Sequence, residues 1–222
     1  MSSFDTHEVF NQAPPFEDVD LFEADLALQE GLAREGGARA ADFVEGLRQL
    51  GRRCGSRAAQ ELARLANVHG PRLAGFDRAG RRIDEIEFHP AWHALMTLLV
   101  EAGAHAAPWS APRPGAHVAR AAAYLLFGQL ENGAQCPVTM TYASVAALRR
   151  APALASVWLP KILAREYDPR PLPVEQKRGA LIGMGMTEKQ GGSDVRSNTT
   201  RATPLLPGEV PDGCAIDGAP VH

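Results

Sequence analysis

The chain of 222 residues is long enough for one large domain or for one domain with part of another, and its apolar share of 45% can supply a substantial core. A formal net charge of −3 argues against a nucleic-acid clamp that acts through bulk charge, and no apolar run reaches the roughly 20 residues needed to span a membrane. The three cysteines fit neither a disulfide framework nor a zinc site, and residues 1–12 predict no secretory signal, so we expect a reducing, cytoplasmic location.

The first part of the chain predicts an antiparallel helical domain. Residues 1–19, which contain two consecutive prolines, predict an extended arm. Asp20 is a candidate N-cap for a helix that continues to about Arg34 and ends at a glycine pair. Apolar residues at helical spacing predict a second helix in ADFVEGLRQLG, and Ser56 can cap a third in RAAQELARLANV.

Further helices are expected after a connector that has a turn at residues 77–80. Pro90 fits the first turn of a long helix, AWHALMTLLVEAGAHAA, and a second long helix follows in HVARAAAYLLFGQLENG. Two shorter helices are expected near residues 138–149 and 152–164. Three prolines in residues 165–179 forbid regular helix and predict a linker.

At Gly179 the pattern changes from helical spacing to strand length. ALIGMGM and TTRATPLL each predict a strand, and GCAIDGAPVH predicts a hairpin that turns at Asp217 and Gly218. We therefore expect a helical domain over residues 1–178 and the beginning of a β domain over residues 179–222. Because so few strands cannot form an independent domain of normal size, the chain is expected to stop inside its second domain.

GMGMTEKQGGSDVRSNTT, from Gly183 to Thr200, is the main candidate for a binding loop. Its spacing excludes a dinucleotide fingerprint, because Glu188 stands where the third glycine is required, and a P-loop, because Gly-Lys-Ser/Thr is missing. Glycines at 191 and 192 allow positive φ and close approach of backbone N–H groups to a flat or anionic ligand, while Thr187 and Ser193 add hydroxyls. A glycine-rich surface loop between strands is the alternative that these residues leave open.

The same segment resembles the flavin-binding signature of the acyl-CoA dehydrogenase family, where an apolar strand precedes Thr-Glu, Gly-Ser-Asp and a Thr-Thr pair. The matching residues are Thr187, Glu188, Gly192, Ser193, Asp194, Thr199 and Thr200. Lys189 stands where the family usually has proline. Together with VFNQ, RLANV, FHPAWH, CPVTMTYA and QKRGALIGMGM, the segment is similar to the AidB-like branch of alkylation-response flavoproteins, over almost the whole chain.

The resemblance implies a mainly α fold, in which an N-terminal helical domain of the acyl-CoA dehydrogenase type precedes the first strands of a truncated β-barrel domain. It implies FAD as the cofactor, with Thr187 close to the flavin ring, and an acyl-CoA thioester that Ser193 also meets. The residues implied to line the FAD are Met184, Gly185, Met186, Thr187, Glu188, Lys189, Gln190, Gly191, Gly192 and Ser193.

The catalytic base of the family, a glutamate that removes the α-proton of the substrate, belongs to a C-terminal helical bundle. The resemblance therefore assigns no catalytic residue in this chain, and Glu188 is not that base. It implies that full-length relatives are homotetramers, and that any DNA binding belongs to the C-terminal part. On this basis the chain resembles a truncated or frameshifted product that is expected to be inactive by itself.

His89 and His93 are four residues apart and could share a helical face. No third ligand has convincing spacing, so a role in helix entry for His89 and in packing for His93 is favoured over a metal site. In CPVTMTYA, the side chains of Thr139, Thr141 and Tyr142 beside Met140 either line a pocket or pack between helices.

Three functions stay open at this point. The first is flavin-dependent α,β-dehydrogenation of acyl-CoA thioesters, which needs a base for the α-proton and a flavin for the β-hydride. The second is a DNA-binding flavoprotein of the alkylation response with little dehydrogenase activity. The third is a helical domain without a ligand.

Overall fold

A computed structural model describes residues 4, 6–201, 215–216 and 219–220. The chain divides into two compact units, Met1–Gly183 and Met184–His222. The domain boundary that we expect at Gly179 stays a prediction.

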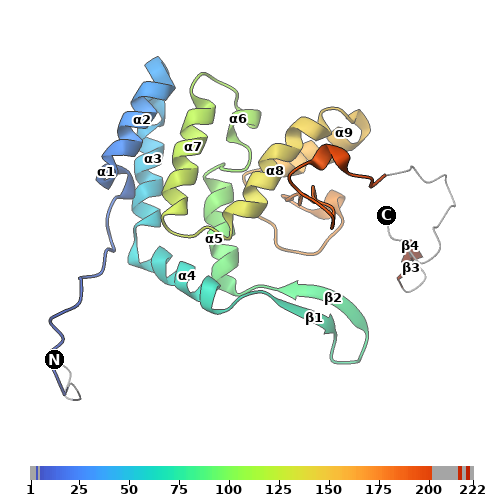
Figure 1. Cartoon of the computed structure of the whole chain (residues 1–222), viewed down its shortest axis with the longest axis horizontal. Coiled ribbons are helices and arrows are strands. Elements are labelled where there is room, and N and C mark those ends of the chain that lie inside the picture. The colour runs from blue at the N-terminus through green and yellow to red at the C-terminus, as the bar shows by residue number, and fades with distance from the viewer. Residues whose placement is uncertain (1–3, 5, 202–214, 217–218, 221–222) are drawn as a thin grey trace. The chain divides into compact units, whose positions relative to one another are not determined.

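The first unit is mainly α, as predicted (Figure 1). Its helices are α1 (Leu21–Ala24), α2 (Leu26–Gly36), α3 (Ala41–Cys54), α4 (Arg57–Val68), α5 (Pro90–Glu101), α6 (Ala107–Ser110), α7 (Ala116–Gly128), α8 (Gln135–Leu148) and α9 (Pro152–Ile162). Short 3-10 turns occupy η1 (Gly37–Arg39) and η2 (Val174–Gln176). Figure 1 shows α2, α3 and α7 side by side, and α7 contacts both α2 and α3.

Several helix starts lie where the sequence predicts them. The Asp20 carboxylate accepts hydrogen bonds from two first-turn amides of α1, and the Ser56 hydroxyl accepts one from the amide of Ala59 in α4. Pro90 begins α5. The single helix predicted from Asp20 to Arg34 is wrong, because Asp25 interrupts it. Its carboxylate accepts from the amide of Leu28 at 2.9 Å and begins α2 as a second helix.

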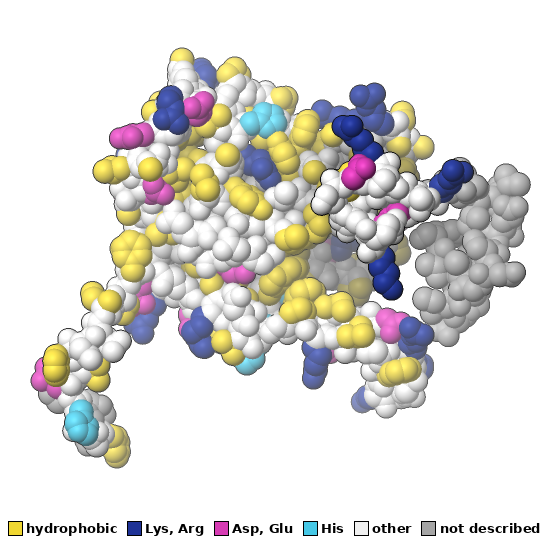
Figure 2. Space-filling view, in the orientation of Figure 1, with side chains coloured by type: hydrophobic (Ala, Val, Ile, Leu, Met, Phe, Trp, Pro, Cys, Tyr) yellow, Lys and Arg dark blue, Asp and Glu magenta, His cyan; other side chains and the backbone are white. Residues whose placement is uncertain are grey.

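The predicted connector between α4 and α5 is a β-hairpin. Strand β1 (Arg72–Phe76) pairs antiparallel with β2 (Arg82–Glu87), and the Asp77 carboxylate accepts from two amides of the turn between them. Leu73 lies opposite Ile86, and both side chains are exposed. Figure 2 shows hydrophobic side chains at the surface of this hairpin. Since neither strand buries one face, their sequences lack the clear alternation from which a strand is predicted.

The main core lies between α1–α3, α5 and α7. Its centre consists of side chains that are almost completely buried, Phe22, Leu95, Met96, Leu99, Leu126 and Phe127. Burying each such side chain is worth about 1.5–3 kcal/mol, so this layer supplies much of the stability of the unit. A smaller core joins Val145 of α8, Ile162 of α9 and Ala180, and it fixes the segment that follows the prolines onto these two helices.

The proline-containing segment after α9 is a fixed loop that polar side chains hold. The buried Asp168 carboxylate accepts from the Arg170 guanidinium at 2.6 and 2.8 Å and from the Arg178 amide at 2.9 Å. These donors, the Arg170 side chain first, hold the pKa of Asp168 far below its usual range. A Cβ at Gly179 would lie 1.9 Å from the Glu166 carbonyl oxygen, so only glycine fits there.

The strand predicted for ALIGMGM is absent from the described structure, where residues 180–187 are neither helical nor paired in a ladder. An apolar run of this length becomes a strand only when a neighbouring strand takes up its backbone groups, and none lies beside it among the described residues. The second predicted strand, TTRATPLL, falls mostly outside these residues. In the predicted hairpin, β3 (Ala215–Ile216) pairs antiparallel with β4 (Ala219–Pro220), as expected.

Candidate functional site

The chain that leads into the candidate loop is anchored by one buried hydroxyl of α8. Thr141 is fully buried, and its Oγ1 donates to the carbonyl of Pro137 one turn earlier, at 2.8 Å. The same oxygen accepts from the backbone N–H of Ile182 at 2.9 Å. The backbone N–H of Ala180 donates to the carbonyl of Lys161 on α9 at 3.1 Å. Thr141 thus packs and anchors the backbone at the end of the first unit.

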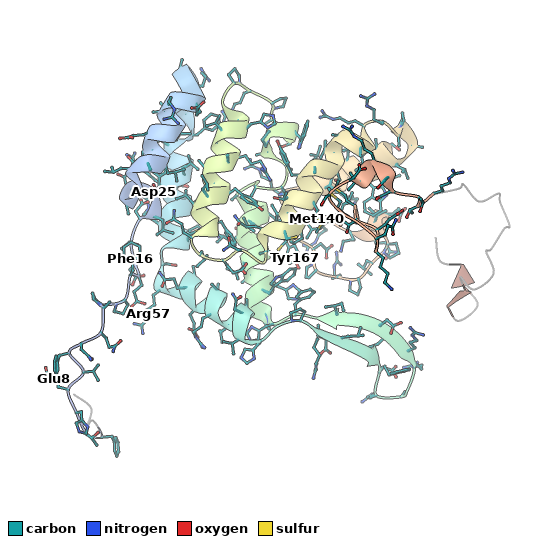
Figure 3. The ribbon with its side chains drawn as sticks, in the orientation of Figure 1. Glu8, Phe16, Asp25, Arg57, Met140 and Tyr167 are labelled. Carbon is teal, nitrogen blue, oxygen red and sulfur yellow. The ribbon has the colours of Figure 1, made fainter. Side chains whose placement is uncertain are left out.

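The neighbours of Thr141 on α8 have hydrogen-bond partners within the helical unit. The Thr139 hydroxyl donates to the phenol oxygen of Tyr124 at 2.7 Å, and the Tyr142 phenol shares a hydrogen bond with His117 at 2.6 Å. Figure 3 labels Met140 on the same helix. For Thr139, Thr141 and Tyr142 these contacts favour the packing alternative.

In the second unit, the motif makes a tight turn with Lys189 and Gln190 at its tip. The amide of Gly191 donates to the carbonyl of Glu188 at 3.1 Å. Residues 184–193 are exposed, apart from the half-buried Glu188. The structure therefore places the whole predicted set of cofactor-lining residues in one short, accessible segment.

The Glu188 carboxylate joins the two ends of the motif. It accepts from the amide of Thr199 at 2.8 Å, and from the amide and hydroxyl of Thr200, each at 2.5 Å. The Gln190 amide group donates to it as well. The Thr200 hydroxyl, followed by the Thr199 and Thr200 amides, lowers the pKa of Glu188 to about 2. The Thr-Glu and Thr-Thr parts of the signature are thus one hydrogen-bonded unit, a relation that the sequence analysis missed.

Gly192 lies where the backbone passes close to the side chain of Thr187. A Cβ at this position would lie 2.8 Å from Cγ2 of Thr187. Neither Gly191 nor Gly192 is among the described glycines with positive φ, so the positive φ that glycine allows is not used at this pair. The absence of a side chain at Gly192 instead lets the backbone pass directly beside Thr187.

Some of the remaining polar groups of the loop form hydrogen bonds within it, and others do not. The Asn198 side chain donates to the carbonyl of Met186 at 2.8 Å, and Asp194 accepts from the Arg196 amide at the start of η3 (Val195–Ser197). Among the described residues, the hydroxyls of Thr187 and Ser193 form no hydrogen bond to another residue. The loop therefore maintains its own shape and leaves these two groups accessible.

The two histidines singled out in the sequence have structural roles. The Nδ1 of His89 accepts from the amide of Ala91 at the start of α5, and its ring stacks on His69. His93 shares a hydrogen bond of 2.8 Å with the phenol oxygen of Tyr167, which is labelled in Figure 3. Burial lowers the pKa of His93 and raises that of Tyr167 to about 12. Both favoured interpretations, helix entry and packing, are confirmed.

The described residues show neither a metal cluster nor a membrane-spanning helix. They contain no group of three His, Cys, Asp or Glu side chains placed to hold a metal ion. Among these residues there is also no helix with the length and apolar character needed to cross a membrane.

Comparison with known proteins places the chain beside the AidB proteins. The family model of the adaptive response protein AidB N-terminal domain matches residues 11–169. The chain is 48% identical over 205 residues to AidB of Escherichia coli (strain K12), an alignment that covers 91% of this chain and 37% of that protein. It is 28% identical over 138 residues to acyl-CoA dehydrogenase family member 11 of Caenorhabditis elegans, covering 61% of this chain and 22% of that protein.

Solved structures agree with this placement. Bd2924 in its apo-form superposes with a TM-score of 0.74 and 29% identity, over 93% of this chain and 39% of that one. ACDH-11 of Caenorhabditis elegans in complex with C11-CoA gives a TM-score of 0.71 over 89% of this chain and 33% of that one. At 22% identity, the second likeness shows a shared fold. The chain spans well under half of the length of each of these proteins.

Replacing Thr141 by valine is expected to destabilise the helical unit by about 1–3 kcal/mol, because the Ile182 amide loses its acceptor in a buried place. Urea unfolding measures the change, and hydrogen exchange of the Ile182 amide reports where it acts. Thr141→Ser, which keeps the hydroxyl, serves as the control. Equal stability of the valine and serine variants would contradict the anchoring role.

The Glu188 carboxyl is expected to titrate near pH 2 in this chain, well below its ordinary value of 4.5. Because folding lowers this pKa, the ionised carboxylate stabilises the loop at all pH values above about 4.5, and this contribution is lost as the pH falls through about 2. A pH titration of the carboxyl carbon by NMR measures the value. Thr200→Val removes the principal donor and should move it upward; titration at the ordinary value in both proteins would refute the hydrogen-bonded loop.

Proposed function

Because this chain belongs to the family of AidB N-terminal domains, within the acyl-CoA dehydrogenases, we propose that residues 184–193 are the flavin-contacting loop of an FAD-dependent site for acyl-CoA thioesters. One feature of the loop supports this most directly. Glu188 and Asn198 take up its internal hydrogen bonds, whereas the hydroxyls of Thr187 and Ser193 are left to a ligand. Exposed hydroxyls on a backbone that is already ordered can bind and orient a cofactor.

The residues of the loop fit a flat, anionic cofactor. In this proposal the Thr187 hydroxyl donates to a polar edge of the flavin ring, and the Ser193 hydroxyl donates toward the pyrophosphate and the acyl-CoA. Gly192 carries no Cβ next to Thr187, so a flat ligand could approach the backbone at this position closely. The bound FAD supplies the acceptor for the hydride from the β-carbon of the substrate.

Glu188 holds the loop and has no part in removing the substrate proton. A carboxylate with a pKa of about 2, whose oxygens already accept from Thr199, Thr200 and Gln190, is a very weak base. The family resemblance assigns the base to a C-terminal bundle, so this chain contributes binding and orientation. C11-CoA in the complex of ACDH-11 supports an acyl-CoA thioester as the class of substrate.

A role in the alkylation response is the second candidate, and the match to the adaptive response protein AidB favours it. With a net charge of −3, this chain lacks the excess of positive charge that usually accompanies DNA binding, so we assign such contacts to other parts of the protein.

The free cysteines Cys54 and Cys136 fit a cytoplasmic location. The family resemblance implies a homotetramer of full-length chains.

Thr187→Ala and Ser193→Ala are each expected to weaken FAD binding by about 0.5–1.5 kcal/mol, the value of one neutral hydrogen bond. The variants are made in a chimera that joins residues 1–200 of this chain to the rest of the Escherichia coli relative, and flavin occupancy is read from visible absorbance. Ser156→Ala on α9, whose hydroxyl donates within its own helix, is the matched control. Unchanged occupancy in both loop variants would refute the assignment.

The 222-residue chain by itself is expected to show no turnover of acyl-CoA, because the proposed site takes its base from a bundle outside these residues. The visible spectrum of the purified chain and electron transfer from acyl-CoA thioesters to an artificial acceptor are the two measurements. A bound flavin peak together with saturable activity would show that the site lies wholly within residues 1–222.

A further inference from the structure

A cavity of about 390 Å³ lies within the helical unit and shares no residue with the candidate loop. It is bounded by α3, the end of α5, α6 and α7. Its apolar walls come from two helices that face each other, with Phe43, Leu47 and Leu50 on α3 and Ala116, Ala119 and Ala123 on α7. The volume falls in the range of small-molecule sites, and the small side chains of Ala116, Ala119 and Ala123 on α7 leave this space open.

The polar side of the cavity is rich in arginine. Four arginines line it, and so do the carboxylates of Asp42 and Glu101. Each carboxylate has a partner, since Glu101 pairs with Arg53 at 3.1 Å and Asp42 pairs with Arg39 at 2.6 Å. The other three arginines of the lining form no ion pair in the part of the chain that the structure describes; they are Arg113, Arg120 and Arg165.

Arg120 is the innermost of the three and is held in a fixed position. Its Nε donates to the carbonyl of Ala104 at 2.7 Å, and its guanidinium lies 3.7 Å from the ring centroid of Tyr142. Its Nη2 is buried and has no hydrogen-bond partner among the described residues. A buried donor of a charged group without a partner is unfavourable and rare in folded proteins. Burial lowers the pKa of Arg120, and the nearby Tyr142 and Tyr124 oppose this shift.

The two outer arginines are placed by packing. The Arg113 guanidinium lies 4.4 Å from the ring centroid of Phe43. Arg165 lies against Gly103, where the backbone has a φ of +74° and a Cβ would come within 3.0 Å of the guanidinium. All three guanidinium groups therefore line the cavity in the described structure.

We propose that this cavity binds a small amphipathic anion, a carboxylate with a short alkyl chain. The planar carboxylate matches the guanidinium groups of Arg113, Arg120 and Arg165, and it supplies the negative charge that these three lack among the described residues. The alkyl chain occupies the apolar space between Leu47 and Leu50 on α3 and the alanines of α7. This site is independent of the proposed flavin loop and would exist whether or not the loop binds FAD.

Isothermal titration calorimetry of the 222-residue chain with sodium octanoate tests the proposal. Octanoate is expected to bind saturably at one site, with octanol and octylammonium weaker by roughly tenfold or more because neither supplies a negative charge. Inorganic phosphate is expected to bind no better than these two, because it has no apolar body. Absence of saturable octanoate binding, or equal affinity for octanol, overturns the proposal. Tighter binding of phosphate would identify a simple anion site and would also overturn it.

Matched variants locate the binding. Ala119→Leu fills the cavity and should abolish octanoate binding, whereas Ala121→Leu, on the exposed side of α7, should leave it unchanged. Arg165→Gln should weaken binding by roughly tenfold, and Arg34→Gln, an exposed arginine of α2, should not. Circular dichroism establishes that each variant is folded. Octanoate binding that survives Ala119→Leu in a folded protein overturns the assignment to this cavity.

Discussion

Buried backbone groups that belong to no helix or strand must find partners elsewhere, and this constraint shapes the segment between α9 and the candidate loop. The amide of Ile182 is satisfied by the hydroxyl of Thr141, and the carbonyl of Ala164 by the ring of His105 at 2.8 Å. The Asp168 carboxylate accepts hydrogen bonds from the backbone amides of Arg170 and Arg178 within the same segment. Thr141 lies on α8 and His105 on the turn after α5, so the order of this segment depends on how the helices pack.

The dependence on distant partners also explains which parts of the fold were predictable. Asp20, Ser56 and Pro90 act on residues within one turn of themselves, so their sequence neighbours are sufficient evidence for a helix start. Asp25 is equally local, but the continuous helical spacing around it hid its capping role. The hairpin β1–β2 depends on pairing across a turn, and its exposed faces gave no alternation to follow.

In the candidate loop, the sequence identified the residues of the motif but not which of them hold the loop together and which stay exposed. Thr187 and Ser193 were singled out as hydroxyl donors, and the structure leaves both exposed. The bonds from Glu188 to Thr199 and Thr200 cross eleven and twelve positions, a separation at which no local rule predicts contact. The glycine pair allows positive φ, but in the structure Gly192 instead leaves room for the side chain of Thr187 beside the backbone, a contact between residues five positions apart.

The internal bonds of the loop bear on how it could bind a ligand. A free glycine-rich loop loses backbone freedom on binding, at about 1–2 kcal/mol for each residue that becomes ordered. Here Glu188 and Asn198 already join residues 186–188 to residues 198–200, so a large part of that ordering is complete without a ligand. Binding energy from the exposed hydroxyls can then appear as affinity and orientation. Because the carboxylate of Glu188 is saturated by its own loop, the residue that makes the loop rigid is separate from the residues that can contact a cofactor.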